Sequence, residues 1–237
     1  MKFVLSALTL AFASVAIAQG PPAPSPQDWK IYVEMKVFAA CAKKLNPLVT
    51  ELRDETKVND AAAKLEKMAE SGEAELVGTI ASQTIENHQI SAFQGEQIRY
   101  PIEFESPYAI EGKDGQTTTP KERPRDIAYP ATTYETRNVG LALELDVNAS
   151  PDGKRFVVTA KPRRTWFLKW DEYENGRLAN NDRIIAKQPR FASAEASSTI
   201  AMANQERVLL GVHSVPGSPD KMEVMLLRVW STPRKTP

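Results

Sequence analysis

The chain contains very little cysteine and histidine. Among its 237 residues there are one cysteine, Cys41, and two histidines, His88 and His213. A single cysteine excludes an internal disulfide framework, and its place at the end of the apolar run 37–41 favours a small buried side chain. Neither histidine has a second histidine or a cysteine at metal-ligand spacing. We therefore expect no metal centre, and a solvated or hydrogen-bonded structural role for each histidine.

The chain also lacks an excess of charge and the common catalytic motifs. Its 30 basic residues balance 30 acidic residues, which leaves no electrostatic footprint for nucleic acid or an anionic membrane. There is no Gly-x-Ser-x-Gly, no His-Glu-x-x-His and no phosphate-binding Gly-rich loop. The carboxylates of Asp171, Glu172 and Glu174 are expected in a solvated turn. We predict neither an enzyme nor a cofactor, and an exported hydrolase using these three carboxylates is the weakest alternative.

Residues 161–170 contain basic and aromatic side chains interspersed along one segment. Stacking on nucleic acid would use such a pattern, but the neutral charge of the chain argues against it. Two interpretations stay open. One is an ordinary half-buried strand with Trp166 and Leu168 pointing inward, and the other is a protein or membrane interface.

A long hydrophobic run is present only at the N-terminus. Lys2 precedes the apolar residues 3–15, and residues 16–18 give a small-x-small cleavage pattern. We expect an export signal at 1–18, because this segment is short for a membrane-spanning helix. A Pro-rich linker is predicted at 19–28, followed by a β domain at 29–237 with a mobile loop at about 107–130.

Apolar periodicity predicts strands and two helices. The two-residue alternation at 31–37 and again at 141–147 is typical of half-buried strands, and the turn at 148–153 predicts a hairpin with 155–161. Asn46 is expected to cap the first helix, with Pro47 at its first position. Asn59 is expected to cap the second helix, which should stop near Gly72. Further strands are expected at 188–191, 198–203, 207–211 and 222–230.

The block 76–104 combines a strand, a tight polar turn, a second strand, a Gly-Glu break and a third strand that ends at a proline. This order resembles the opening of the core domain of bacterial secretins, the ring-forming outer-membrane proteins of type II and type III secretion and of type IV pili. The positions that match the family motif are Thr84, Asn87, Gln89, Gly95, Glu96, Ile98 and Tyr100.

Later blocks resemble the same family. They contain a Val-Gly-x-x-Leu pattern, a Gly-containing turn, a Gln-Pro strand and a strand with Leu-Gly near its end, at Val139, Gly140, Leu143, Gly153, Pro189, Leu210 and Gly211. The resemblance implies a mainly β (α+β) fold, with a secretin-like antiparallel β core in a shortened form and two short helices near the N-terminus.

The resemblance also implies a function by assembly. The chain would be a structural component or accessory of a type II or type III secretion or type IV pilus apparatus, in the periplasm or outer membrane of a Gram-negative-type bacterium. Strand edges at 141–147 and 198–211 would pair between protomers. The expected partners are copies of the chain or other secretion-system envelope proteins, with contact to the outer membrane and none to nucleic acid.

The main alternative is a soluble periplasmic scaffold or partner-binding module that keeps the secretin core without forming a pore. It rests on the short segment 212–221. A typical secretin carries a longer insertion there, which forms part of the wall of the pore.

Overall fold

The structure, a computed structural model, describes residues 29–85, 88–104, 110–111, 117–118, 131–177 and 183–233. The predicted signal (1–18), the linker (19–28), Asn87 and most of the loop at 107–130 lie outside the described residues. Within that loop, two short strands pair with each other, at 110–111 and 117–118. The division into signal, linker, β domain and mobile loop stays a prediction.

The described chain consists mainly of antiparallel strands, with two helices near its N-terminal end, so the predicted fold class is confirmed. The elements in chain order are β1 (Trp29–Cys41), α1 (Ala42–Leu52), α2 (Val58–Glu70), β2 (Glu75–Thr84), β3 (Ile90–Phe104), β4 (Ile110–Glu111), β5 (Thr117–Thr118), β6 (Ala131–Ala149), β7 (Arg155–Arg177), β8 (Arg183–Glu195), β9 (Ser198–Ala203), β10 (Arg207–Val215) and β11 (Ser218–Pro233).

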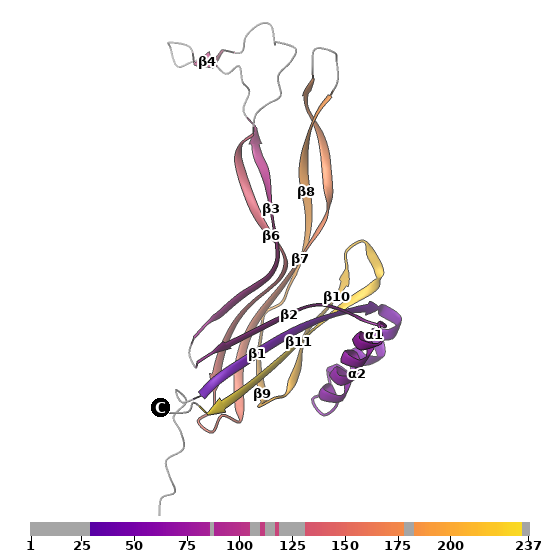
Figure 1. The fold of residues 1–237 in the computed structure, drawn as a ribbon, viewed down its shortest axis with the longest axis vertical. Helices are drawn as coiled ribbons and strands as arrows, with labels where there is room; N and C mark the ends of the chain where they lie inside the picture. The colour runs from indigo at the N-terminus through magenta and orange to yellow at the C-terminus, as the bar shows by residue number, and fades with distance from the viewer. Residues whose placement is uncertain are drawn as a thin grey trace, which may run out of the picture.

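Two sheets form the body of the molecule (Figure 1). The helix-backed sheet has four strands in the order β10-β11-β1-β2. The long-strand sheet has the order β3-β6-β7-β8, and β9 also pairs with β7. β8 and β9 share one edge of β7, because β9 pairs with its beginning and β8 with the remainder. Neighbouring strands in both sheets run antiparallel.

The main hydrophobic core lies between these sheets. Ile31 on β1, Leu143 on β6 and Phe156 on β7 belong to one buried cluster, and each is at most 1% exposed. The intervening side chains on β1 and β6 are mostly half-buried or exposed, so the two predicted half-buried strands are confirmed. The predicted hairpin is confirmed too, since β6 and β7 pair directly across the turn at 150–154.

The two helices cover the other face of the helix-backed sheet, where they lie close to β10 and β11 (Figure 1). Helix α1 begins four residues before the predicted Asn46 cap, at Ala42, so Pro47 lies inside the helix. Proline is favoured at a first helical position, but the apolar face of α1 already starts at the buried Leu45. Helix α2 ends as predicted, before Gly72, whose φ of +78° suits glycine.

Replacing Leu45 with alanine tests this packing. Leu45 is 0% exposed in the cluster between the helices and β11. We expect the substitution to lower the free energy of unfolding by about 2–5 kcal/mol, because it removes buried methyl groups and leaves a cavity. Leu168→Ala is the matched control, since Leu168 is 40% exposed. Urea unfolding followed by circular dichroism measures both, and an equal loss in the two variants would show that α1 is not packed as described.

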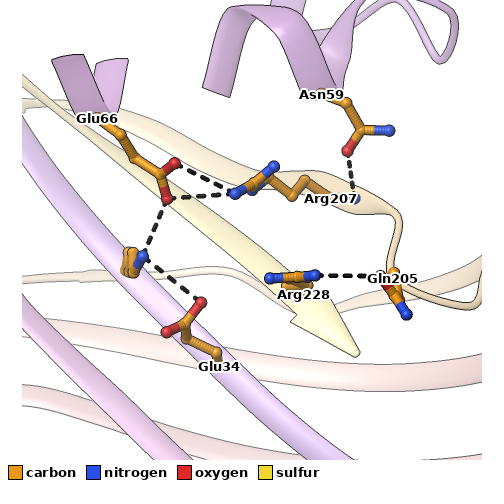
Figure 2. A network of polar contacts seen from close by, with 7 residues as sticks. Glu34, Asn59, Glu66, Gln205, Arg207 and Arg228 are labelled. Carbon is orange, nitrogen blue, oxygen red and sulfur yellow. Dashed lines mark hydrogen bonds and ion pairs between the residues drawn. The ribbon is translucent and has the colours of Figure 1, made fainter. Parts of the chain in front are cut away.

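A polar network ties α2 to the helix-backed sheet (Figure 2). The Glu66 carboxylate lies 2.9 Å from Lys36 Nζ on β1 and 3.2 Å from Arg207 Nη2 on β10. The backbone N–H of Arg207 donates to Asn59 Oδ1 at 3.2 Å. Asn59 is therefore not the cap of α2, which begins one residue earlier, at Val58. Its side chain instead fixes the start of β10 against the helix.

The block 76–104 differs from its predicted form. β2 and β3 belong to different sheets, so they do not form a hairpin, and the chain crosses between the sheets after Thr84. β3 also runs without interruption through Gly95, Glu96 and Pro101, where a break and a third strand were expected. An edge strand tolerates proline because half of its N–H groups face away from the sheet.

Three other expectations are wrong, two about exposure and one about a turn. Cys41 is exposed, because it is the last residue of β1, where the chain turns into α1. Leu168 is exposed because the register between β7 and β8 shifts between Phe167 and Lys169, and an extra residue turns the following side chains to other faces. Trp166, by contrast, is partly buried. The carboxylates at 171–174 lie within β7 and not in a turn.

Candidate functional site

The long-strand sheet divides into two ribbons part of the way along its length. The β6–β7 ladder runs from the Ala149–Phe156 pair to the Gly140–Thr165 pair and then stops. Beyond this point β6 pairs only with β3, and β7 only with β8. We call these parts the β3–β6 ribbon (96–104 with 131–139) and the β7–β8 ribbon (166–177 with 183–192). Figure 1 shows them rising separately from the body.

Gly95 and Gly140 lie opposite each other where the division begins. Gly140 has a φ of +138°, a conformation that residues with a side chain rarely adopt. A Cβ atom on Gly140 would collide with the backbone oxygen of Gln94, and one on Gly95 would collide with that of Val139. Two positions of the family motif are thus brought together as a pair that requires two glycines.

An aromatic contact joins the two ribbons just above the glycine pair. The ring centroids of Tyr100 on β3 and Phe191 on β8 are 5.7 Å apart, and the guanidinium of Arg137 lies over the Phe191 ring at 5.1 Å. Gln188 Nε2 donates to the carbonyl oxygen of Pro101 at 2.5 Å. Burial, followed by the hydrogen bond with Glu135, raises the pKa of Tyr100. Tyr100 therefore stays neutral at physiological pH and holds the ribbons in contact.

The remaining motif positions serve local structure. Glu96 and Ile98 lie on β3 opposite Val139 and Arg137, and Pro189 lies on β8 opposite Trp170. Gly153 closes the β6–β7 turn with a φ of +65°, and a Cβ there would lie 2.6 Å from the Trp29 ring. Leu210 and Gly211 lie at a register shift in β10.

Within the described chain, both sheets have open edges, where a strand has no hydrogen-bonded neighbour on its outer side. Among the described residues, β2 and β10 have a hydrogen-bonded neighbour on one side only, and so do β3 and β8. β9 likewise pairs only with β7. The expectation of an edge at 198–211 therefore agrees with the sheet order, whereas the one at 141–147 is wrong, because this part of β6 lies between β3 and β7.

Within the described ranges, the ribbons carry most of the large exposed apolar side chains. A two-stranded ribbon is only marginally stable alone in water, and unpaired edges attract further strands. The exposed apolar residues of the two ribbons, each at least 40% exposed, are Ile102, Tyr134, Leu168, Trp170, Tyr173 and Ile185.

The acidic and histidine side chains of the described residues are mostly engaged in ion pairs and hydrogen bonds. Within the described ranges, no cluster of three or more His, Cys, Asp or Glu side chains is placed to hold a metal ion. No helix of the described chain has the length and apolar character needed to cross a membrane. Asp171 pairs with Arg190 at 2.8 Å and Lys169 at 2.9 Å, and Glu172 pairs with Lys187 at 3.0 Å. His213 Nε2 donates a hydrogen bond to the Glu223 carboxylate at 3.1 Å, in keeping with the hydrogen-bonded structural role expected of it.

No protein-family model and no curated protein matches the chain. Several solved structures are similar to it over most of its length. The type II secretion system secretin GspD of E. coli K12 is 12% identical, with 86% of this chain and 49% of that chain covered and a TM-score of 0.37. The InvG secretin domain of the Salmonella SPI-1 injectisome is 9% identical, with 88% of this chain and 62% of that chain covered and a TM-score of 0.35. The V. cholerae type IV competence pilus secretin PilQ is 10% identical, with 86% of this chain and 58% of that chain covered and a TM-score of 0.34.

The chain thus spans less than two thirds of the length of each of these solved chains. All three are secretins, the family that the motif around Gly95 and Tyr100 resembles.

Proposed function

We propose that this chain is a structural component of a cell-envelope protein-secretion or pilus apparatus, and that it acts by assembling into a ring and not by catalysis. The observation that carries the proposal is the pair of open edges on each of its two stacked sheets. The secretin-like motif supports the kind of apparatus. Export to the periplasm or outer membrane belongs to the same proposal and rests on the signal pattern at 1–18.

Strand direction in the helix-backed sheet allows head-to-tail assembly. Its four strands alternate in direction, so its edge strands β10 and β2 run opposite ways. In a ring, rotation about the central axis keeps every protomer in the same orientation. β2 of one protomer would then lie antiparallel to β10 of the next, and the sheet would continue around the ring.

The edge strands of the long-strand sheet also run in opposite directions. β3 forms one edge, and β8 and β9 form the other and run opposite to β3. A head-to-tail contact would place them antiparallel, which is the pairing used throughout the fold. One rotation can therefore join both sheets of neighbouring protomers at once.

The surface beside β10 has room for a neighbour. A groove of about 380 Å³ runs along β10, with Leu52 and Val58 among its lining residues. On β2, the opposite edge, Leu76 is 48% exposed. A large apolar side chain at one edge and a partly apolar groove at the other suit a heterologous contact between copies.

Lysines on the β2 edge test the proposal. Ala81 and Gln83 are exposed on β2, and the double variant Ala81→Lys, Gln83→Lys should block strand addition, because edge lysines keep their charge solvated. We expect a large fall in the assembled fraction, measured by size-exclusion chromatography with light scattering, and an unchanged far-UV circular dichroism spectrum, because the protomer keeps its fold. Thr50→Lys, on the exposed side of α1, is the control and should assemble as the parent does. Normal assembly of the double variant would contradict pairing through β2.

The alternative, a soluble periplasmic scaffold, has one observation in its favour. β10 and β11 are joined by a tight turn at 216–217, where a typical secretin has a longer insertion. Cell fractionation separates the two proposals. The ring component should stay with outer membranes after a high-salt wash, and the scaffold should appear in the soluble periplasmic fraction.

A further inference from the structure

A buried carboxylate joins the two sheets near the point where the ribbons separate. Glu223 of β11 is only 3% exposed. Its carboxylate accepts hydrogen bonds from Arg164 Nε at 3.1 Å and from Trp166 Nε1 at 3.4 Å, both on β7. His213 Nε2 on β10 lies 3.1 Å from the same group. We call these four residues the Glu223 cluster.

The Glu223 cluster holds a defined place in the fold. Arg164 directly precedes Thr165, which forms the last β6–β7 pair with Gly140. Glu223 and His213 lie opposite each other near the turn that joins β10 and β11. The cluster therefore attaches β7, at the base of the β7–β8 ribbon, to the helix-backed sheet. The β3–β6 ribbon meets β7 at the glycine pair.

Within the part of the chain that the structure describes, the charged or titratable groups that interact with the Glu223 carboxylate are Arg164 and His213. Its neighbour on β1 is Ala39, which brings no charge. Trp166 completes the packing, with its ring 5.1 Å from both the His213 ring and the Arg164 guanidinium. Loss of the negative charge would leave the guanidinium of Arg164, 15% exposed, without an ionic partner.

We propose that the Glu223 cluster is an acid-sensitive clasp that sets the position of the β7–β8 ribbon relative to the helix-backed sheet. When the carboxylate is charged, both sheets are bound to it. When it is protonated, the positive charge of Arg164 is no longer balanced, and the end of the β10–β11 hairpin that carries His213 and Glu223 is no longer held to β7, while the hydrophobic core between the sheets stays packed. The clasp acts within one protomer and does not depend on ring assembly.

The direction of the pH effect follows from the environment of Glu223. Burial alone would raise the pKa of this carboxyl, but the hydrogen bonds from His213 and Arg164 and the charge of Arg164 outweigh burial and lower the pKa below its ordinary value. A carboxylate with a lowered folded-state pKa stabilises the fold above the unfolded-state pKa. That contribution is lost as the pH falls through the folded-state value, so the clasp releases in acid and stays closed at neutral pH.

Spin labels on the two sides of the clasp test the proposal in the full chain. The labels are attached at Ser214→Cys on β10 and Tyr173→Cys on β7, both exposed positions, with Cys41→Ser as background. Labelled protein is diluted with unlabelled protein, so that only distances within a protomer are measured by double electron–electron resonance. Far-UV circular dichroism checks that the strands persist.

We expect a single narrow distance at about pH 7 and a broad, shifted distribution as the pH is lowered stepwise until the carboxyl is protonated. Glu223→Gln should show the broad distribution already at neutral pH. Glu172→Gln should behave as the parent, because Glu172 is 58% exposed beside Lys187. A narrow distance that is kept by the parent in acid, or by Glu223→Gln at neutral pH, overturns the proposal. The acid measurement keeps Glu223 itself in the labelled protein, so a failure of Glu223→Gln to fold leaves it decisive.

Discussion

Replacing Gly140 with alanine is expected to lower the free energy of unfolding by about 3 kcal/mol or more. Two costs add. The φ of +138° at Gly140 is strained for any residue with a side chain. The new Cβ would also collide with the backbone oxygen of Gln94, which cannot rotate away as a side chain can. Because Gly140 lies opposite Gly95 where the ribbons begin, the damage should extend to the β3–β6 ladder.

Gly211→Ala is the matched control for this prediction. A Cβ at Gly211 would meet no atom within 4 Å, and Gly211 lies on an edge strand without a positive φ. We expect its effect to stay within about 1 kcal/mol. Both variants are measured by urea unfolding at one protein concentration, since assembly would otherwise add to the apparent stability. Equal stabilities for the two variants would contradict the close approach of β3 and β6 at this pair.

The second large effect is expected at Phe156, in the core between the sheets. Phe156→Ala should lower the free energy of unfolding by about 3–5 kcal/mol, because the ring is 1% exposed and its removal leaves a cavity between β7 and the helix-backed sheet. Phe93→Ala is the control, since Phe93 is 40% exposed on β3. Thermal unfolding followed by tryptophan fluorescence compares them. A similar melting temperature for both would show that the sheets do not pack through Phe156.

Single strands were predictable from the sequence, because each half-buried strand has its own alternation of apolar and polar residues. On β1 and β6, every second residue faces the core, and the apolar alternation shows this directly. The β6–β7 turn was also predictable, since Gly153 adopts a positive φ that few other residues tolerate. These features depend on local residues only.

Strand partners could not be predicted in the same way. The polar residues after Thr84 are typical of a hairpin turn, but nothing in them specifies that β2 pairs with β1 and β3 with β6. The Gly95 position was predicted to be a break, and glycine does weaken the interior of a strand. Its actual role, the close approach to Gly140, depends on a residue far away in the sequence.

The candidate site was predicted in part. The secretin-like motif identified both glycines of the pair, but not the division of the sheet, since strand patterns alone do not say where a ladder stops. Glu223 was missed, although a signal exists. It is a lone acidic residue in the apolar stretch 222–227, and a charge in a buried strand implies a buried partner.

The central claim is that open strand edges join copies of this chain, and its mass in solution tests this most directly. The full chain has a mass of 26.3 kDa. Size-exclusion chromatography with multi-angle light scattering, run in buffer and in detergent, should give a species several times heavier than 26.3 kDa. A single species of monomer mass in both solvents would contradict the claim.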